Sequence, residues 1–172
     1  MYKKFLRIKL LVIFCLAIVA CTNEEVSKGE YLKKGIVLFE KEQYKESELE
    51  IKNAIQEDPK VAEAYYYMAL VNEKSKKFKA MRENLLESVR LDPESEKSRL
   101  KLGKVHFLFN DTDKSLEEVN VILAKTPDQL DALSLKASIF LRQEKIDEAL
   151  EIIEKVLQQD AKHIEAVSLK TI

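Results

Sequence analysis

The stretch Glu50-Ile51-Lys52-Asn53-Ala54-Ile55-Gln56-Glu57-Asp58-Pro59 ends in an Asp-Pro step. A similar sequence precedes two further proline steps, Asp92-Pro93 and Thr126-Pro127. These three steps contain every proline of the 172-residue chain, and consecutive prolines are 34 residues apart. A fourth copy is due at position 161, where Asp160-Ala161 retains the acidic residue without the proline. So regular a spacing indicates an internal repeat, in which each unit forms one supersecondary element.

Each proline step marks the end of a helix. Proline has no backbone N–H to donate, and it disfavours helical geometry at the residue before it, so a helix that contains Ile51 and Ala54 has to end at Asp58. In the first unit we therefore expect one helix near Lys28 to Lys41 and a second near Lys45 to Asp58. The sequence thus predicts two helices in each unit.

The pattern inside the units resembles the tetratricopeptide repeat, a family in which each unit of about 34 residues is a pair of antiparallel helices. The first unit has the family's aromatic, small, aromatic, small, bulky, small and proline residues at Tyr31, Gly35, Tyr44, Ser47, Ile51, Ala54 and Pro59. The second unit departs from the pattern at Met81, and the third departs at Arg99 and Thr112. The resemblance implies an all-α solenoid of about four helix-turn-helix units and a short terminal helix.

The repeat phase divides the chain into segments. We predict a domain at residues 28–172, with units at residues 28–61, 62–95, 96–129 and 130–163 and a partial cap at residues 164–172. Ile164, Val167 and Leu169 can pack on the preceding helix, as the terminal helix of a solenoid usually does. Because this cap is brief, two interpretations stay open: another subunit covers it, or the chain is the front portion of a longer array.

Residues 1–20 have the pattern of a secretion signal. Met1 to Lys9 carry four basic residues and no acidic ones, and Leu10 to Ala20 is an unbroken run of apolar and small residues. So short a run cannot span about 30 Å of hydrocarbon, which favours a cleaved signal peptide. Ile18-Val19-Ala20-Cys21 resembles a bacterial lipobox, which implies that Cys21 becomes an acylated first residue and that residues 21–27 form a tether.

The lipoprotein resemblance also implies a location. Thr22 is not the aspartate that is associated with retention in the inner membrane, so we expect the outer membrane, facing the periplasm. Acyl chains, palmitate among them, would anchor the protein firmly, since each buried CH₂ contributes about 0.8 kcal/mol. Two alternatives stay open: a plain signal peptide cut near Ala20, or an uncleaved anchor.

Charge argues against a nucleic-acid partner. Residues 1–20 contain four of the 29 basic residues and none of the 30 acidic ones, so the remainder carries 25 basic against 30 acidic side chains. This net charge of about −5 is unsuited to phosphate binding, which needs a basic face.

Sites for chemistry are not indicated. His106 and His163 lie in different units without a histidine four residues away or a nearby cysteine, so we expect no metal site. Asn110-Asp111-Thr112-Asp113 lacks the spacing of a calcium loop, and we interpret it as a turn in which Asp113 caps the next helix. No phosphate loop, nucleophile motif or acid/base pair is recognisable, which predicts a protein that is not an enzyme and needs no cofactor.

A binding groove is expected on the concave face, because in this family positions 2, 5, 9 and 12 of the first helices usually receive a peptide or a partner helix. The candidate groove residues are Leu32, Ile36, Phe39, Tyr66, Leu70, Lys97, Leu100, Lys104, Phe107 and Leu141, with Asp131, Ser134 and Ser138 at the remaining positions of unit four. They predict a mainly apolar channel with a basic patch at Lys97 and Lys104, suited to an amphipathic or extended segment. Alternatively, the tether or a second copy covers Leu32, Ile36 and Phe39.

The function favoured by these features is a non-catalytic, lipid-anchored scaffold in the bacterial envelope that binds a protein partner. Residues 50–59 after a lipobox are similar to repeat lipoproteins of exopolysaccharide export and sorting systems, which implies a role there. One alternative is a pilotin-like assembly factor for an outer-membrane secretin or β-barrel machine. Another is an accessory subunit of an envelope enzyme, or a polysaccharide binder.

Overall fold

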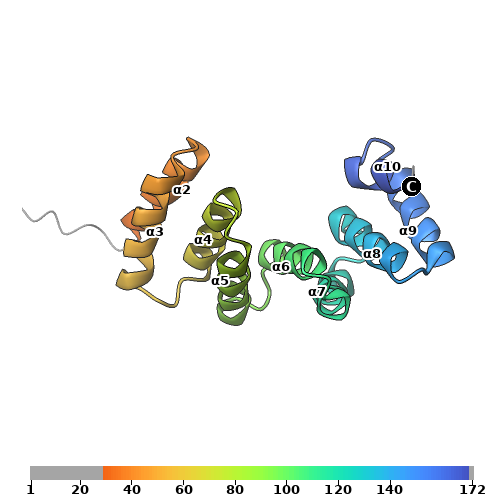
Figure 1. The fold of residues 1–172 in the computed structure, drawn as a ribbon, viewed down its shortest axis with the longest axis horizontal. Coiled ribbons are helices and arrows are strands. Elements are labelled where there is room, and N and C mark those ends of the chain that lie inside the picture. The colour runs from red at the N-terminus through yellow and green to blue at the C-terminus, as the bar shows by residue number, and fades with distance from the viewer. Residues whose placement is uncertain (1–28, 171–172) are drawn as a thin grey trace, which may run out of the picture.

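The structure, a computed structural model, describes residues 29–170, so the predicted signal peptide, Cys21 and the tether at residues 21–27 lie outside it. Within this range the chain forms helices without strands (Figure 1). The helices are α2 (Glu30–Glu40), α3 (Tyr44–Glu57), α4 (Ala62–Lys74), α5 (Phe78–Leu91), α6 (Glu96–Leu108), α7 (Thr112–Lys125), α8 (Leu130–Arg142), α9 (Ile146–Gln159) and α10 (Ile164–Lys170). The all-α prediction is confirmed. Across residues 29–170, no helix combines the length and the apolar character that crossing a bilayer requires.

The helices pack in consecutive pairs. The hairpins are α2–α3, α4–α5, α6–α7 and α8–α9, and the second helix of each pair also packs on the first helix of the next. Figure 1 shows the pairs side by side in a curved row, with α2 at one end and α10 at the other. The α3, α5 and α7 helices each end two residues before a proline, within one residue of the predicted end, because proline cannot continue the helical hydrogen bonds.

Two hairpins bring their helices together through a glycine and a serine. The Ser47 hydroxyl donates a hydrogen bond of 2.8 Å to the Gly35 carbonyl, and Ser115 donates an equal bond to Gly103. A Cβ on Gly35 would lie 2.7 Å from Cγ1 of the buried Ile51. The small residues of the repeat pattern therefore set the distance between helices, as expected from close side-chain packing.

The hydrophobic core is divided among the junctions of the row. Each of four clusters combines buried side chains from neighbouring elements, such as Leu85 on α5 with Leu102 on α6, both fully buried. Burying one such side chain stabilises the fold by about 1.5–3 kcal/mol. Because no single core unites residues 29–170, the stability of each unit depends on its neighbours, as in other solenoids.

The turn inside each hairpin repeats one conformation. Glu42, Lys76, Asn110 and Glu144 all have φ between 56° and 62°. In the third hairpin the next N–H, that of Asp111, then donates to the His106 carbonyl five residues back, at 2.9 Å. The prediction that Asp113 caps the second helix is wrong: Asp111 precedes α7 and Asp113 lies in its first turn. The Asp111 carboxylate instead accepts a hydrogen bond from Lys114, which lowers the pKa of Asp111.

Arg99 explains the irregular third unit. Its guanidinium donates from Nη1 to Glu118 and from Nε to the Pro93 carbonyl, at 2.6 Å each. Both side chains of the Arg99–Glu118 pair are only 16% exposed. An ion pair between the helices thus occupies the position where the family prefers an aromatic ring.

Candidate binding groove

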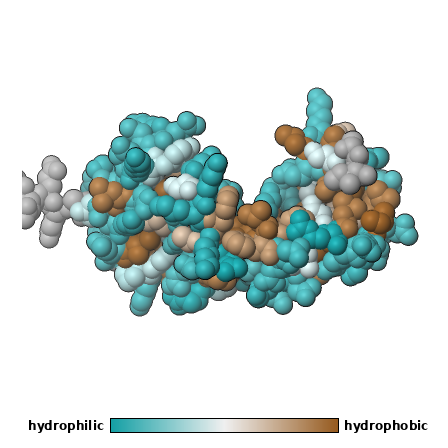
Figure 2. All heavy atoms as spheres, viewed as in Figure 1, coloured by the Kyte–Doolittle hydropathy of each residue, from teal (hydrophilic) through white to brown (hydrophobic). Residues whose placement is uncertain are grey.

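The first helices of the hairpins form the inner face of the curved row. Contacts link α2 with α4, α6 with α8, and α8 with α10, whereas no comparable contacts join the second helices α3, α5, α7 and α9 to one another. The first helices are therefore the more closely spaced set, as the concave side of a solenoid requires. Figure 2 shows the resulting hollow between the two ends of the molecule, with hydrophobic side chains at its floor.

The predicted apolar groove residues are half-buried rather than fully exposed. Six of them also pack against the core clusters: Leu32, Phe39, Tyr66, Leu100, Phe107 and Leu141. Ile36 and Leu70 are also half-buried, but they do not belong to those clusters. The floor is consequently held in place by the core beneath it, and a ligand that covered it would bury a preformed surface.

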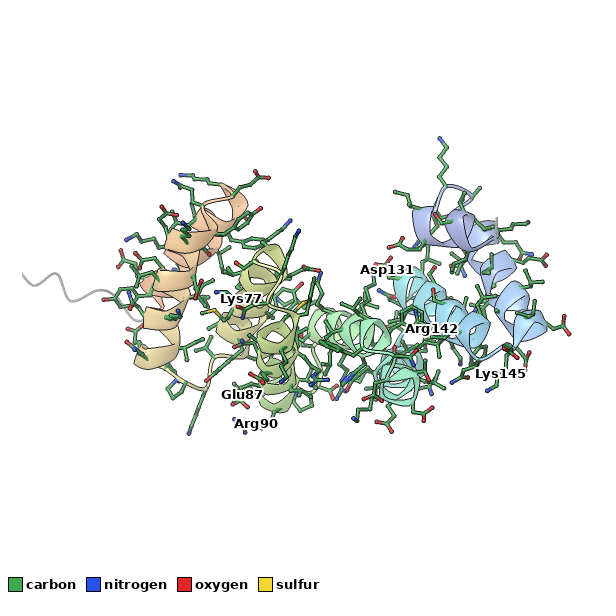
Figure 3. The ribbon with its side chains drawn as sticks, in the orientation of Figure 1. Lys77, Glu87, Arg90, Asp131, Arg142 and Lys145 are labelled. Carbon is green, nitrogen blue, oxygen red and sulfur yellow. The ribbon has the colours of Figure 1, made fainter. Side chains whose placement is uncertain are left out.

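Cations lie over the aromatic rings of this face. Lys97 Nζ is 4.9 Å from the centroid of Tyr66 and 5.9 Å from that of Tyr67. Arg142 lies on α8 (Figure 3), and its guanidinium is 3.5 Å from the centre of the Phe107 ring and donates to the Phe107 carbonyl. Burial raises the pKa of the Tyr66 phenol, which keeps this hydroxyl a neutral donor. Such cation–π contacts hold the rings and provide surfaces on which a partner's side chains can stack.

The predicted basic patch is balanced by acidic residues from other helices. Lys97 pairs with Glu63 at 3.0 Å, and Lys104 pairs with Glu165 of α10 at 3.5 Å. The neighbouring Lys101 pairs with Glu73 at 3.0 Å. The inner face therefore carries alternating charges over an apolar floor, and it does not present the net positive charge that Lys97 and Lys104 alone suggested.

The unit-four end of the groove is closed by α10. Ser134 was expected to face the groove, but it is buried, and its hydroxyl lies 3.3 Å from Nδ1 of His163. His163 Nδ1 also accepts a hydrogen bond from the Ala166 N–H at the start of α10, while its Nε2 lies 3.2 Å from Asp131. The α10 helix is thereby fixed over α8. The predicted packing of Ile164 and Val167 is wrong, since they are 78% and 43% exposed, whereas Ala166 is buried and Leu169 packs against the core.

This contact also gathers the set of side chains best suited to a metal ion among residues 29–170. One ligand atom each from Asp131, His163 and Glu165 lies within 4.8 Å of the others. The sequence could not reveal the set, because Asp131 is 32 residues from His163. Both His163 nitrogens already have partners in the chain, so the arrangement serves the attachment of α10.

His106, in unit three, is buried. Burial lowers the pKa of its imidazole despite Asp111 at 3.9 Å. No hydrogen-bond partner is found for its Nδ1 among the described residues. His106 therefore acts as a neutral core side chain.

Comparisons with known proteins agree with this geometry. Residues 100–164 match the family model described as tetratricopeptide repeat. The fold is a tetratricopeptide-repeat solenoid. No curated protein sequence matches the chain.

Among similar solved structures, YrrB, described as a TPR protein with an unusual peptide-binding site, is 21% identical with a TM-score of 0.75, over 85% of this chain and 75% of its own. MamA is 21% identical with a TM-score of 0.72, over 79% and 80% of the two chains. Pseudomonas aeruginosa pilF is 16% identical with a TM-score of 0.71, over 83% of this chain and 67% of its own. At these identities the likeness concerns the fold alone.

Several groove residues were missed from the sequence. Glu63 is at the same repeat position as Lys97, 34 residues earlier, so the period itself could have predicted their pairing. Arg142 follows the last groove position of its helix, and nothing in the repeat pattern predicts that it reaches Phe107 of the preceding unit. Such contacts depend on how far neighbouring units rotate.

Proposed function

We propose that this protein is a non-catalytic scaffold that binds an extended or amphipathic segment of a partner protein in the concave groove. The observation that carries the proposal is the half-buried apolar floor on the first helices, bordered by charges of both signs. Apolar anchors in such a groove supply affinity, and paired charges at its border select orientation. A tetratricopeptide-repeat fold is typical of protein-binding scaffolds, which supports this proposal.

The chemistry of the groove defines the segment that fits. Leu70, Ile36 and the aromatic rings favour apolar or aromatic anchors on the partner. Each groove lysine already pairs with a carboxylate of this chain. A partner that separates such a pair has to offer a negative group to the lysine and a positive group to the released carboxylate. We therefore expect the partner segment to be amphipathic and nearly neutral rather than strongly acidic.

We further propose that the scaffold is held on the bacterial outer membrane by acyl chains on Cys21, where exopolysaccharide export is the first system to test. The support is the sequence of residues 1–21 and the resemblance of residues 50–59 to repeat lipoproteins. Labelled palmitate should enter the wild-type chain and its Cys15→Ser variant but not Cys21→Ser. Labelling that survives Cys21→Ser would overturn the anchor.

The groove is tested with a matched pair of variants in the full chain. Leu70→Glu puts a charge in the groove outside the core clusters, whereas Leu49→Glu puts the same charge on α3, where Leu49 is 60% exposed. We expect purification from detergent-solubilised membranes to recover the partner with wild type and Leu49→Glu, and at least tenfold less with Leu70→Glu. Equal recovery with both variants, at equal helicity, would contradict groove binding.

A further inference from the structure

The turn between α4 and α5 carries a concentration of positive charge that the groove does not use. Residues 74–82 contain five basic and no acidic residues: Lys74, Lys76, Lys77, Lys79 and Arg82. The equivalent residues 40–48, 108–116 and 142–150 of the other units contain more acidic than basic ones. The charge is therefore a property of this turn and not of the repeat.

Most of this charge has no counter-ion close by. Among the described residues, the one ion pair in this turn joins Lys77 to Glu48 at 3.5 Å, and Lys74 lies over the Tyr44 ring at 5.8 Å. Lys76 occupies the apex of the turn and is exposed, as is Lys79. The turn consequently presents a net positive surface to the solvent.

Exposed apolar side chains accompany the cations. Phe78 is 38% exposed and lies one helical turn before Arg82, on the same face of α5. The Arg82 guanidinium is 4.7 Å from the ring of Phe109, which is 42% exposed, and the adjacent Leu108 is 59% exposed. We call residues 74–82 together with Leu108 and Phe109 the basic strip.

The opposite ends of the same hairpins carry charges of both signs. Lys77 lies at one end of α5, and Glu87 and Arg90 lie toward the other (Figure 3). The turns between hairpins there carry Asp58, Asp92, Glu94, Asp128 and Asp160, but they also carry Lys60 and Lys162, and Glu94 and Asp128 pair with Lys125 and Lys155. The α4–α5 turn is therefore the hairpin turn that favours approach to a negatively charged surface, because residues 40–48, 108–116 and 142–150 hold more acidic than basic residues.

We propose that the basic strip docks on the surface of a bilayer containing anionic lipids. Lysines near such a surface are attracted to its negative potential, while protruding Phe and Leu side chains insert at the headgroup boundary. The apolar residues of the strip protrude from turns instead of lining a hollow, which suits a deformable lipid surface better than a partner's pocket. Docking would direct the turns between hairpins away from the membrane and leave the concave groove accessible.

The chain between Cys21 and the solenoid can accommodate this orientation. The Gly29 N–H, at the start of α2, donates to the Glu57 carboxylate and so lies at the edge that carries the turns between hairpins. A segment from Cys21 to Gly29 extends to about 26 Å at about 3.3 Å per residue. The α2 helix is about 16 Å long at 1.5 Å per residue, so attachment at Cys21 and contact through the strip can occur on the same membrane.

The absence of tryptophan from the chain allows a direct test. Phe109→Trp adds an indole in the strip, and Ile164→Trp adds one at the start of α10, where Ile164 is 78% exposed. Each full chain is placed in nanodiscs of phosphatidylcholine alone or with phosphatidylglycerol, with brominated acyl chains as quenchers. We expect fluorescence at position 109 to fall at least twofold in anionic discs only, and position 164 to be unaffected.

The charge dependence separates the proposal from alternatives. Adding Lys76→Glu and Lys79→Glu to Phe109→Trp should abolish the quenching, as should high salt. Equal quenching at both positions, or quenching indifferent to lipid charge, would overturn the proposal. An emission shift with polyglutamate and none with anionic discs would overturn it in favour of an acidic protein partner. If Phe109→Trp loses helicity, Leu108→Trp is used in its place. Recovery of the groove partner with Leu70→Glu is a separate measurement, so either proposal can fail without the other.

Discussion

The hairpins α2–α3 and α6–α7 both join their helices by a glycine–serine contact and an ion pair, but the basic residue of the ion pair is at a different repeat position in each. Both have a glycine at the eighth position and a serine that bonds to it, and both have a glutamate at the twenty-third, Glu50 or Glu118. In the first hairpin Lys34, at the seventh position, pairs with Glu50 at 2.5 Å. In the third, Arg99 at the fourth position pairs with Glu118, and the seventh position is the fully buried Leu102.

The residue at the seventh position differs because the third hairpin packs on a preceding unit there, whereas the same position of the first hairpin is exposed to solvent. Leu102 packs against Met81 and Leu85 of the preceding unit, so its position must be apolar. Lys34 is 61% exposed, and the charge there remains in water. The comparison teaches that a repeat position specifies a contact, and that the neighbouring unit decides which residue type can make it.

The glycines give the largest expected difference between the two hairpins. A Cβ on Gly35 would lie 2.7 Å from Cγ1 of Ile51, whereas on Gly103 it would lie 3.2 Å from the flexible end of Leu135. We expect Gly35→Ala to lower the free energy of unfolding by about 2 kcal/mol through overpacking. Gly103→Ala should change it by less than about 0.5 kcal/mol, because the gain in helix propensity offsets the tighter contact. Equal losses in urea denaturation would show that the two helix pairs are equally close.

The two ion pairs give the next effect. Glu118→Ala leaves Arg99 without its carboxylate in a mostly buried place, and we expect a loss of about 1.5 kcal/mol. Glu50→Ala should lose less, since Lys34 can be solvated and Oε2 of Glu50 has no hydrogen-bond partner among the described residues. Urea midpoints at constant m-value measure both. A larger loss for Glu50→Ala would reverse the interpretation of the two ion pairs.

His106 gives the smallest effect, at the position where the first hairpin has Leu38. Burial lowers the pKa of His106, so protons bind more readily to the unfolded chain. The stability due to neutral His106 is therefore complete above the ordinary pKa of about 6.5 and decreases as the pH falls below it. Thermal midpoints at pH 7.5 and 5.5 should differ less in His106→Leu than in wild type. An unchanged difference would assign the acid sensitivity to other groups.

The sequence predicted the repeat architecture more completely than the groove. Proline spacing and small residues predicted the helix pairs, because these signals act within one unit. The groove residues were named by repeat position, and the structure makes the apolar ones half-buried. Pairing partners such as Glu165 for Lys104, and the burial of Ser134 beneath His163, were not predicted, since they join residues of different units.

What the sequence determined by itself is local: where helices end, which faces are apolar, and that the units repeat, because backbone sterics and helical periodicity operate over a few residues. What only the tertiary structure decided is how charges are shared between units. The inner lysines are neutralised by carboxylates from other units, while the lysines of the α4–α5 turn are largely left to the solvent. That division depends on the curvature of the stack, which arises from many small side-chain contacts at every junction and is encoded in no single stretch of the chain.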